Sequence, residues 1–195
     1  SRLKRKALLK IGNLSSIEYC LKNALKFNNI NFTVLATSNL DSDDELKHQT
    51  FNSQVIFRRG DPHDVVKRYL EIIDELKIDV VVRVTGDMPF VSNDILQILL
   101  KSHYKSGADY TVGKDAAVGT NLEIINSAAL REIKKYFKSA DYSEYMTWYF
   151  QNNPEHFKLN FVDLPSHLVR NFRLTLDYQK DLDMFNKVDK HFKDN

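Results

Sequence analysis

The hydrophobic pattern is clearest between positions 79 and 89, which read Asp-Val-Val-Val-Arg-Val-Thr-Gly-Asp-Met-Pro. Four valines in five positions predict a strand buried on both faces, as in the centre of a parallel sheet. The strand stops at Thr85 and Gly86, and the carboxylate of Asp87 follows at once. Because ligands of open α/β sheets bind beyond the carboxyl ends of the strands, Asp87 stands where a metal or a phosphate is expected. On the pattern alone, an ordinary Gly-Asp turn is an equal alternative.

The rest of the chain alternates between the periods of strands and helices. Ser15 and Glu18 form a capping box in front of one helix, and Asp61 with Pro62 predicts the start of another. Such alternation indicates right-handed βαβ units, and so an α/β fold with a mostly parallel sheet covered on both faces. The pattern predicts strands at 31–38, 54–59, 79–85, 108–112, 121–125, 156–164 and 172–176, and helices at 15–27, 41–48, 62–76, 92–100, 127–137, 141–152 and 178–192.

Composition then narrows the class of partner. The 195 residues suffice for one domain with a substantial core. Lys and Arg number 28 and Asp and Glu 26, so the net charge of +2 gives no reason to expect nucleic acid or a membrane as partner, and a small molecule is expected instead. The single cysteine, Cys20, indicates a reducing compartment and a buried thiol. No apolar run approaches the roughly 20 residues of a membrane span and no signal peptide is recognisable, so we expect a soluble, cytoplasmic protein.

Two segments allow more than one interpretation. Residues 1–10 carry four cations within the first six positions. Such a segment is usually a solvated tail, but it could also be a polyphosphate-binding loop whose preceding strand lies outside this sequence. The predicted helix at 141–152 is rich in aromatic residues, which at helical spacing form a core or a dimer contact more often than a stacking platform for bases. None of the six histidines has the spacing of a zinc site or an acyl-transfer triad.

Several motifs, taken in order over nearly the whole chain, resemble the cytidylyltransferases of the spore-coat polysaccharide type, relatives of the CMP-sialic acid and CMP-Kdo synthetases. In that family a first strand leads into a loop of the form Ala-Arg-x-x-Ser-x-Arg-Leu-Pro-x-Lys. Residues 1–6 resemble its second half, with Lys4 and Arg5 where Pro and Gly are usual. The other matching motifs are Phe-Arg-Gly and Asp-Val-x-x-Arg-Tyr within 57–69, Arg-x-Thr-Gly-Asp-x-Pro at 83–89, Gly-x-x-x-Glu at 119–123 and Arg-Leu-Thr-x-Asp-x-x-x-Asp-Leu at 173–182. The family's Arg-Glu-His-x-Thr is Ser-Glu-Tyr-Met-Thr at 143–147.

This resemblance implies a Rossmann-like, three-layer nucleotidyltransferase fold with a mostly parallel central sheet and a small β-rich insertion. It implies one domain over residues 1–195 that lacks its first strand in this sequence, with about 113–165 forming a lobe for the acceptor and for dimerisation. A homodimer is implied in the same way. The altered motif at 143–147 leaves the identity of the acceptor open.

The implied reaction moves CMP from CTP to a hydroxyl of a sugar or sugar acid and releases pyrophosphate, in the biosynthesis of a surface polysaccharide or glycoconjugate. The catalytic residues would be Arg2, Lys6 and Asp87. The two cations would offset the charge of the triphosphate that the attacking oxygen must approach, and Asp87 would hold a divalent metal for the same purpose. Mg²⁺, a hard ion that takes oxygen ligands, would bind Asp87 and Asp177. The implied nucleotide contacts are Ser1, Arg2, Lys6, Thr37, Ser38, Arg58, Arg83, Thr85 and Gly86, and the implied acceptor contacts are Gly119, Glu123, Glu144 and Thr147.

Other interpretations exist for single residues and for the whole chain. Asp177 also suits the N-cap of the following helix, and Arg83 suits a buried structural ion pair. A glycosyltransferase has a similar α/β nucleotide domain but normally shows an Asp-x-Asp motif, whereas Asp-Leu-Asp at 181–183 lies inside a predicted helix. A non-catalytic relative that binds a sugar or a nucleotide is the third hypothesis, favoured by the altered loop at Lys4 and Arg5.

Overall fold

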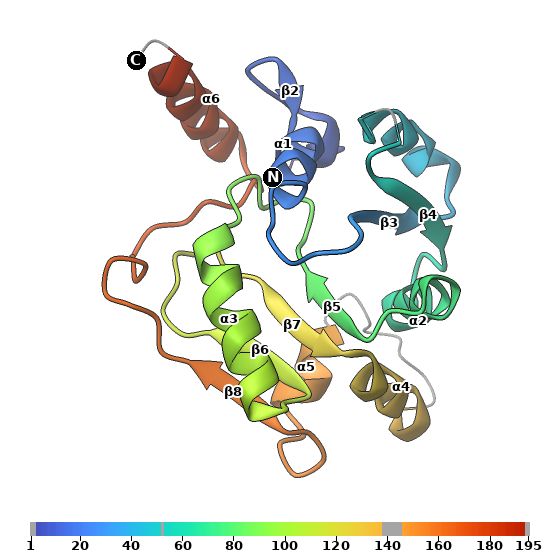
Figure 1. Ribbon diagram of the computed structural model, residues 1–195. Helices are drawn as coiled ribbons and strands as arrows, with labels where there is room; N and C mark the ends of the chain where they lie inside the picture. The colour runs from blue at the N-terminus through green and yellow to red at the C-terminus, as the bar shows by residue number, and fades with distance from the viewer. Residues whose placement is uncertain (1–2, 52, 138–145, 194–195) are drawn as a thin grey trace.

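The computed structural model describes residues 3–51, 53–137 and 146–193. Helices alternate with strands along most of this chain (Figure 1). In the described part, no helix is both long and apolar enough to cross a bilayer. The helices are η1 (Lys6–Leu8), α1 (Ser16–Ala24), η2 (Asp41–Gln49), α2 (Val65–Leu76), α3 (Asn93–Ser106), α4 (Ser127–Tyr136), α5 (Met146–Gln151) and α6 (Gln179–Lys193). Of the helix predicted at 141–152, α5 covers 146–151, and residues 141–145 lie outside the described part.

The central sheet has four strands in the order β5 (Val80–Arg83), β7 (Glu123–Asn126), β6 (Tyr110–Gly113) and β8 (Leu159–Val162). The strand β7 runs antiparallel to both of its neighbours, whereas β6 and β8 are parallel. Three of the four strands therefore share one direction, in a mixed α/β sheet. The prediction that 79–85 forms the centre of a parallel sheet is wrong in this structure, because β5 stands at the end of the four-stranded sheet and its partner β7 is antiparallel.

Two further strand pairs complete the described part. The strands β1 (Lys10–Ile11) and β2 (Leu14–Ser15) form a short antiparallel hairpin in front of α1. The strands β3 (Val34–Ser38) and β4 (Ile56–Gly60) form a parallel pair connected through η2. The predicted strands at 31–38 and 54–59 are thus confirmed.

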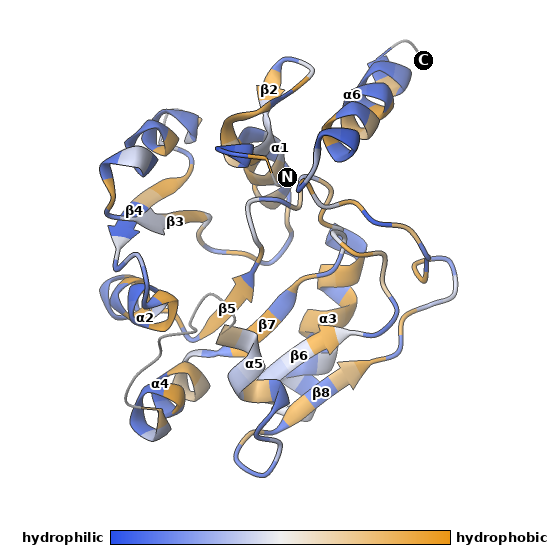
Figure 2. Ribbon diagram, turned by 180° about the vertical axis from the view of Figure 1, so that it is seen from behind, coloured by the Kyte–Doolittle hydropathy of each residue, from blue (hydrophilic) through white to orange (hydrophobic). Residues whose placement is uncertain are grey.

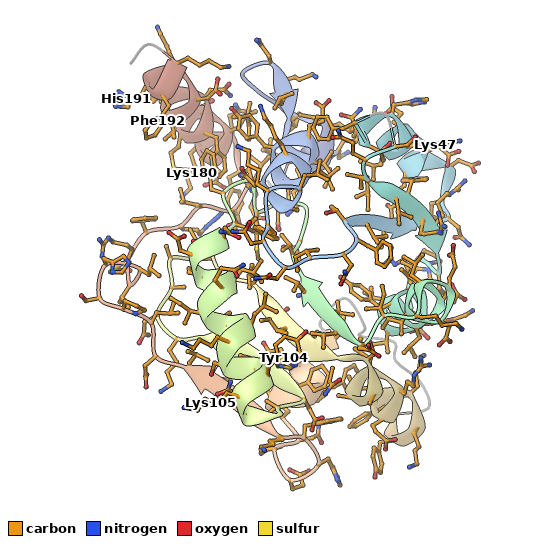
Figure 3. All side chains as sticks on the ribbon, viewed as in Figure 1. Lys47, Tyr104, Lys105, Lys180, His191 and Phe192 are labelled. Atoms are coloured by element: carbon orange, nitrogen blue, oxygen red, sulfur yellow. The ribbon has the colours of Figure 1, made fainter. Side chains whose placement is uncertain are left out.

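The facing edges of β3 and β5 have no strand between them among the described residues. A groove of about 490 Å³ lies there, lined by Leu35 and Ala36 of β3, by Val80 and Val82 of β5, and by side chains of α1 and α2. Tyr104 of α3, labelled in Figure 3, also borders it. All four residues of β5 are only half-buried because one edge of the strand faces this groove, although the strand is as apolar as predicted (Figure 2).

The core lies on both faces of the four-stranded sheet. Adjacent residues of β7 point to opposite sides: Ile124 packs with Leu96 of α3, whereas Ile125 packs with Leu130 of α4 and Phe150 of α5. All five side chains are fully buried. The helix α2 joins α4 and α5 on their face, so that helices cover the sheet on both sides. This agrees with the predicted three-layer α/β arrangement.

The start of α1 follows the predicted capping box. The Ser15 hydroxyl accepts a hydrogen bond from the Glu18 N–H at 3.2 Å, and the Glu18 carboxylate accepts one from the Ser15 N–H at 2.6 Å. Two otherwise unpaired backbone donors are satisfied in this way. The helix ends at Ala24, earlier than the predicted end near Phe27.

The predicted start of α2 at Asp61 and Pro62 is wrong. The helix begins at Val65, and Asp64 caps it by accepting a hydrogen bond from the Lys67 N–H at 2.8 Å. The Asp61 carboxylate instead accepts from the two N–H groups that follow Pro62, at 3.0 Å each, and holds a turn before the helix. Aspartate is a favourable N-cap residue at either position, and because Asp61 is engaged in the turn, Asp64 caps the helix.

The strand predicted at 172–176 is also wrong. Its only pairing in the described structure is a single bridge between Val118 and Arg173. The Leu174 N–H donates to the Val118 carbonyl at 2.6 Å, but the Leu176 N–H donates to the Asp87 carbonyl at 2.9 Å. Because the partner changes within two residues, no ladder forms. The segment instead fastens the start of α6 to the loop that follows β5.

Candidate active site

Three charged side chains from distant parts of the chain meet beyond the carboxyl end of β5. The Lys6 Nζ lies 2.7 Å from Asp87 Oδ2 and 2.9 Å from Asp177 Oδ1. Lys6 opens η1, Asp87 follows β5, and Asp177 precedes α6. The side chains of the two aspartates are only 21% and 20% exposed, so a cation is needed between them to offset their mutual repulsion. The sequence predicted all three residues, and the structure brings them together.

The pKa of Lys6 reflects this position. Partial burial disfavours the charged form, but the hydrogen bonds to Asp87 and Asp177, with their negative charges, outweigh burial and raise the pKa of the ammonium above its usual value. Lys6 is therefore a fixed positive charge at neutral pH.

The loop that carries Lys6 has a left-handed residue in front of it. Arg5 has φ 52° and ψ 33°, a conformation that glycine adopts freely and that is costly for other residues. Glycine is the residue that the resemblance places at this position. Arg5 keeps the backbone turn and pairs with Glu45 of η2 at the surface. The altered loop thus retains the shape that directs Lys6 toward the two aspartates.

Asp87 is oriented by its own loop. Its Oδ1 accepts a hydrogen bond from the Thr85 hydroxyl, which leaves Oδ2 for Lys6. The Met88 N–H donates to the Thr85 carbonyl at 3.1 Å and closes a turn at the end of β5. Gly86 lies inside this turn, and a Cβ there would come within 3.0 Å of Ile17 of α1. The Thr-Gly-Asp sequence therefore sets the carboxylate beyond the strand end, as predicted.

Asp177 is oriented by Asp181, a residue to which the sequence pattern assigns no role. The Asp181 Oδ2 accepts hydrogen bonds from the backbone N–H groups of Asp177 at 3.0 Å and Tyr178 at 2.8 Å. It also lies 2.8 Å from Arg173 Nη2, which in turn lies 3.3 Å from Asp177 Oδ2. The signal available in the sequence was a carboxylate in the first turn of a predicted helix, where it can bond back to the N-terminal N–H groups. Figure 3 labels Lys180 at this end of α6 and His191 and Phe192 at its outer end.

Two residues predicted as ligand contacts lie inside the protein instead. Arg83 of β5 forms an ion pair with Glu123 of β7, and both side chains are largely covered, at 14% and 16% exposure. The Tyr110 hydroxyl donates to Glu123 Oε1 at 2.7 Å, and Gln151 Nε2 donates to the Tyr110 hydroxyl at 3.3 Å. Burial and the Glu123 charge raise the pKa of Tyr110 far above its usual value. The structural ion pair considered for Arg83 is therefore what the structure shows.

The other predicted nucleotide contacts divide into two groups. Thr37 and Ser38 end β3, are 7% exposed, and donate their hydroxyl hydrogen bonds to Asp43 of η2. Arg58 does not lie at a strand end: it sits in the middle of β4 and pairs with Glu75 of α2. The prediction that Arg58 lies on the same rim as Thr37 and Ser38 is wrong, because its side chain contacts α2, whereas theirs contact η2.

The predicted acceptor contacts are dispersed. Gly119 has φ +94°, and a Cβ there would lie 2.1 Å from the Leu174 carbonyl oxygen, so only glycine fits beside that backbone. Thr147 lies on α5, half-buried. Ser1, Arg2 and Glu144 fall outside the described residues.

The donor set suits a magnesium ion. Among the described residues no group of three or more His, Cys, Asp and Glu side chains is arranged to hold a metal. Asp87 and Asp177 nevertheless present two carboxylate oxygens to one cation, Lys6. Mg²⁺ is commonly bound by one or two carboxylates together with phosphate oxygens, so this pair fits the ion when a polyphosphate supplies further ligands.

Known proteins resemble this chain in sequence and in fold. The spore coat polysaccharide biosynthesis protein SpsF of Bacillus subtilis is 31% identical over 150 residues, which cover 76% of this chain and 62% of SpsF, less than two thirds of its length. A cytidylyltransferase structure from Leptospira borgpetersenii is 25% identical with a TM-score of 0.88 and covers 98% of this chain and 82% of that one.

A structure of a CMP:2-keto-3-deoxy-manno-octonic acid synthetase complexed with CTP has the same fold, with a TM-score of 0.72 at 14% identity over 98% of this chain and 94% of that one. The family profile described as "Cytidylyltransferase" matches residues 1–193. The two solved structures thus share the Rossmann-like fold over nearly the whole of this chain, the family profile spans the same residues, and the chain belongs to the cytidylyltransferase family.

Proposed function

We propose that this protein transfers CMP from CTP to a hydroxyl of a sugar or sugar acid, releasing pyrophosphate, in the biosynthesis of a surface polysaccharide or glycoconjugate. The observation that carries this proposal is the convergence of Lys6, Asp87 and Asp177 beyond the carboxyl end of β5. In α/β folds this is where nucleotides bind. Family membership, SpsF as a relative and the CTP-bound synthetase as a structural neighbour support the choice of CTP and of a sugar-type acceptor.

The chemistry needs positive charge near the α-phosphate. The acceptor oxygen bonds to the α-phosphorus while the bond from that phosphorus to the bridging oxygen breaks, so pyrophosphate leaves and the hydroxyl proton passes to solvent. Negative charge accumulates on the phosphate oxygens in the transition state. Lys6 is a fixed ammonium within the site and would stabilise this charge, and Arg2 is the second cation to which we assign this role. A Mg²⁺ ion held by Asp87 and Asp177 would neutralise the triphosphate further and polarise the α-phosphate.

Other residues have supporting parts in this proposal. Thr85 and Gly86 shape the loop that presents Asp87, and Thr37 and Ser38 end the strand on the other side of the groove. Arg83 and Glu123 support the end of β5 from within the sheet.

Pyrophosphate release tests the proposal. The wild-type protein is incubated with Mg²⁺, one of CTP, UTP, ATP or GTP, and a panel of sugars and sugar acids. We expect release with CTP and a subset of acceptors. Asp87→Asn should lower the rate by roughly a hundredfold or more, as when a group that stabilises transition-state charge is lost. Asp74→Asn is the matched control, because Asp74 forms an exposed pair with Arg131 of α4. Calorimetry with CTP reports binding separately from turnover. A well-folded wild type that binds no CTP contradicts the proposal.

A further inference from the structure

The position of Lys6 has a consequence for metal binding. Its ammonium contacts one oxygen of Asp87 and one of Asp177, at 2.7 and 2.9 Å. The second oxygen of each carboxylate is bound elsewhere: Asp87 Oδ1 by the Thr85 hydroxyl, and Asp177 Oδ2 by Arg173. The oxygens that face each other across the site are therefore those that Lys6 occupies.

We propose that Lys6 and a divalent cation compete for the carboxylates of Asp87 and Asp177. The cation would bind between them when a polyphosphate attracts the Lys6 ammonium away from them. The proposal rests on the proposed function, since it concerns the same site. The ammonium donates hydrogen bonds to these carboxylate oxygens and a hard divalent cation would take the same oxygens as ligands, so one of the two can occupy the place between the carboxylates at a time. Lysine suits such an exchange because its ammonium is a point charge on a flexible four-carbon stem, which can turn toward phosphate while the backbone of η1 stays in place.

The competition has a thermodynamic consequence. In the free protein Lys6 lowers the affinity for a divalent cation, because the cation must first displace an ammonium held by two charge-assisted hydrogen bonds. A polyphosphate that attracts Lys6 removes this penalty, so the two ligands bind with positive coupling. Linkage makes the coupling reciprocal: the metal strengthens polyphosphate binding by the same factor.

Among the described residues, the neighbouring cations Arg173 and Lys4 do not provide the same effect. Arg173 lies on the far oxygen of Asp177 and is itself held by Asp181 at 2.8 Å, so it can stay in place when Lys6 leaves. Lys4 lies in the same loop as Lys6 but is exposed. Within the part of the chain that the structure describes, the exchange thus concerns Lys6, and a variant of Lys4 provides a control of equal charge change.

The test measures Mn²⁺ binding without any nucleotide, by the loss of the free-ion electron paramagnetic resonance signal. Mn²⁺ is the probe because it takes the same oxygen ligands as Mg²⁺. We expect Lys6→Met to bind Mn²⁺ at least about fivefold more tightly than wild type, the lower end of usual coupling strengths. Lys4→Met should stay within about twofold of wild type, as expected for an exposed charge that salt screens. In the double variant Lys6→Met with Asp177→Asn, the gain should disappear.

Each contrary result overturns the proposal. Unchanged or weaker Mn²⁺ binding in Lys6→Met shows that the lysine does not compete, and an equal gain in Lys4→Met shows a general charge effect. A gain that survives Asp177→Asn places the ion elsewhere. If circular dichroism shows that Lys6→Met does not fold, Lys6→Gln is used instead, because the glutamine amide can still donate a hydrogen bond to one of the two carboxylates. Pyrophosphate release by wild type is scored separately, so a failure of the proposed function is distinguished from a failure of this inference.

Discussion

Asp181 is the residue on which the geometry of Asp177 depends. It is 8% exposed, and one carboxylate oxygen receives two backbone N–H groups and the Arg173 guanidinium at 2.8 to 3.0 Å. Replacing it with alanine removes all three partners at once and leaves Arg173 beside a single aspartate. The replacement Asp181→Asn keeps an acceptor oxygen of the same shape but removes the charge.

The magnitude follows from these contacts. Hydrogen bonds to a charged group contribute about 1.5 to 3 kcal/mol each, and contributions within one network do not add fully. We therefore expect Asp181→Ala to lower the free energy of unfolding by about 3 kcal/mol, and Asp181→Asn to lower it by about 1 kcal/mol. For a chain of this size, about 3 kcal/mol corresponds to a fall in Tm of roughly 6 to 12 °C.

The assay is urea unfolding followed by circular dichroism and by tryptophan fluorescence, whose transitions must coincide for a two-state analysis. Asp183→Ala is the matched control: it lies in the same helix turn, is exposed, and bonds only Gln179, at 2.8 Å, among the interactions described. It should change the free energy of unfolding by less than about 0.5 kcal/mol. The reasoning is refuted if Asp181→Ala is no less stable than Asp183→Ala, or if the asparagine variant loses as much as the alanine variant.

Three further predictions concern other parts of the fold. His103 is 2% exposed and its Nδ1 lies 2.8 Å from the Thr111 hydroxyl, and burial lowers its pKa. Because the unfolded state then binds more protons than the folded state, the free energy of unfolding falls as the pH drops through about 6.5. His103→Gln should flatten the stability profile between about pH 7 and 5 in urea titrations. Arg5→Gly should raise the free energy of unfolding by about 1 kcal/mol, because it removes left-handed strain while the exposed Glu45 pair contributes little; a loss of stability would contradict this. An apolar, β-branched hexapeptide fused ahead of Ser1 should raise Tm and protect the β3 and β5 amides from hydrogen exchange, and the same peptide with a central proline should not.

Local signals in the sequence were reliable where neighbouring residues decide the structure. The capping box of Ser15 and Glu18 and the turn after β5 depend on contacts within three residues, and both formed as predicted. The start of α2 was misplaced because Asp61 and Asp64 are both good caps, and only the turn held by Asp61 shows which one is used.

Contacts between distant segments could not be derived in that way. Lys6 and Asp177 are 171 positions apart, and no periodicity connects them. Arg58 and Arg59 are adjacent on β4, yet one pairs with Glu75 and the other lies 2.7 Å from Asp44 of η2. Successive residues of a strand point to opposite faces of the sheet. Arg58 therefore lies on the face of α2 and Arg59 on the face of η2, and an error of one position exchanges the two. Motif matching selected Arg58, and the structure places its side chain against Glu75 of α2.

The largest disagreement between sequence and structure lies at β5. Its valines are typical of a strand with neighbours on both sides, whereas edge strands usually carry charges, proline or bulges that discourage further pairing. In the described structure these valines are half-buried and face a groove, and the opposite wall of that groove is β3, equally apolar at Leu35 and Ala36. Leu3, whose N–H donates to the Asp177 carbonyl at 2.9 Å, lies at the site end of β5, where a strand running alongside it would finish. A strand in the groove would bury both edges and satisfy their backbone groups, so pattern and structure would then agree. The fused hexapeptide tests this directly, since a proline at its centre removes a ladder hydrogen bond without removing the apolar surface.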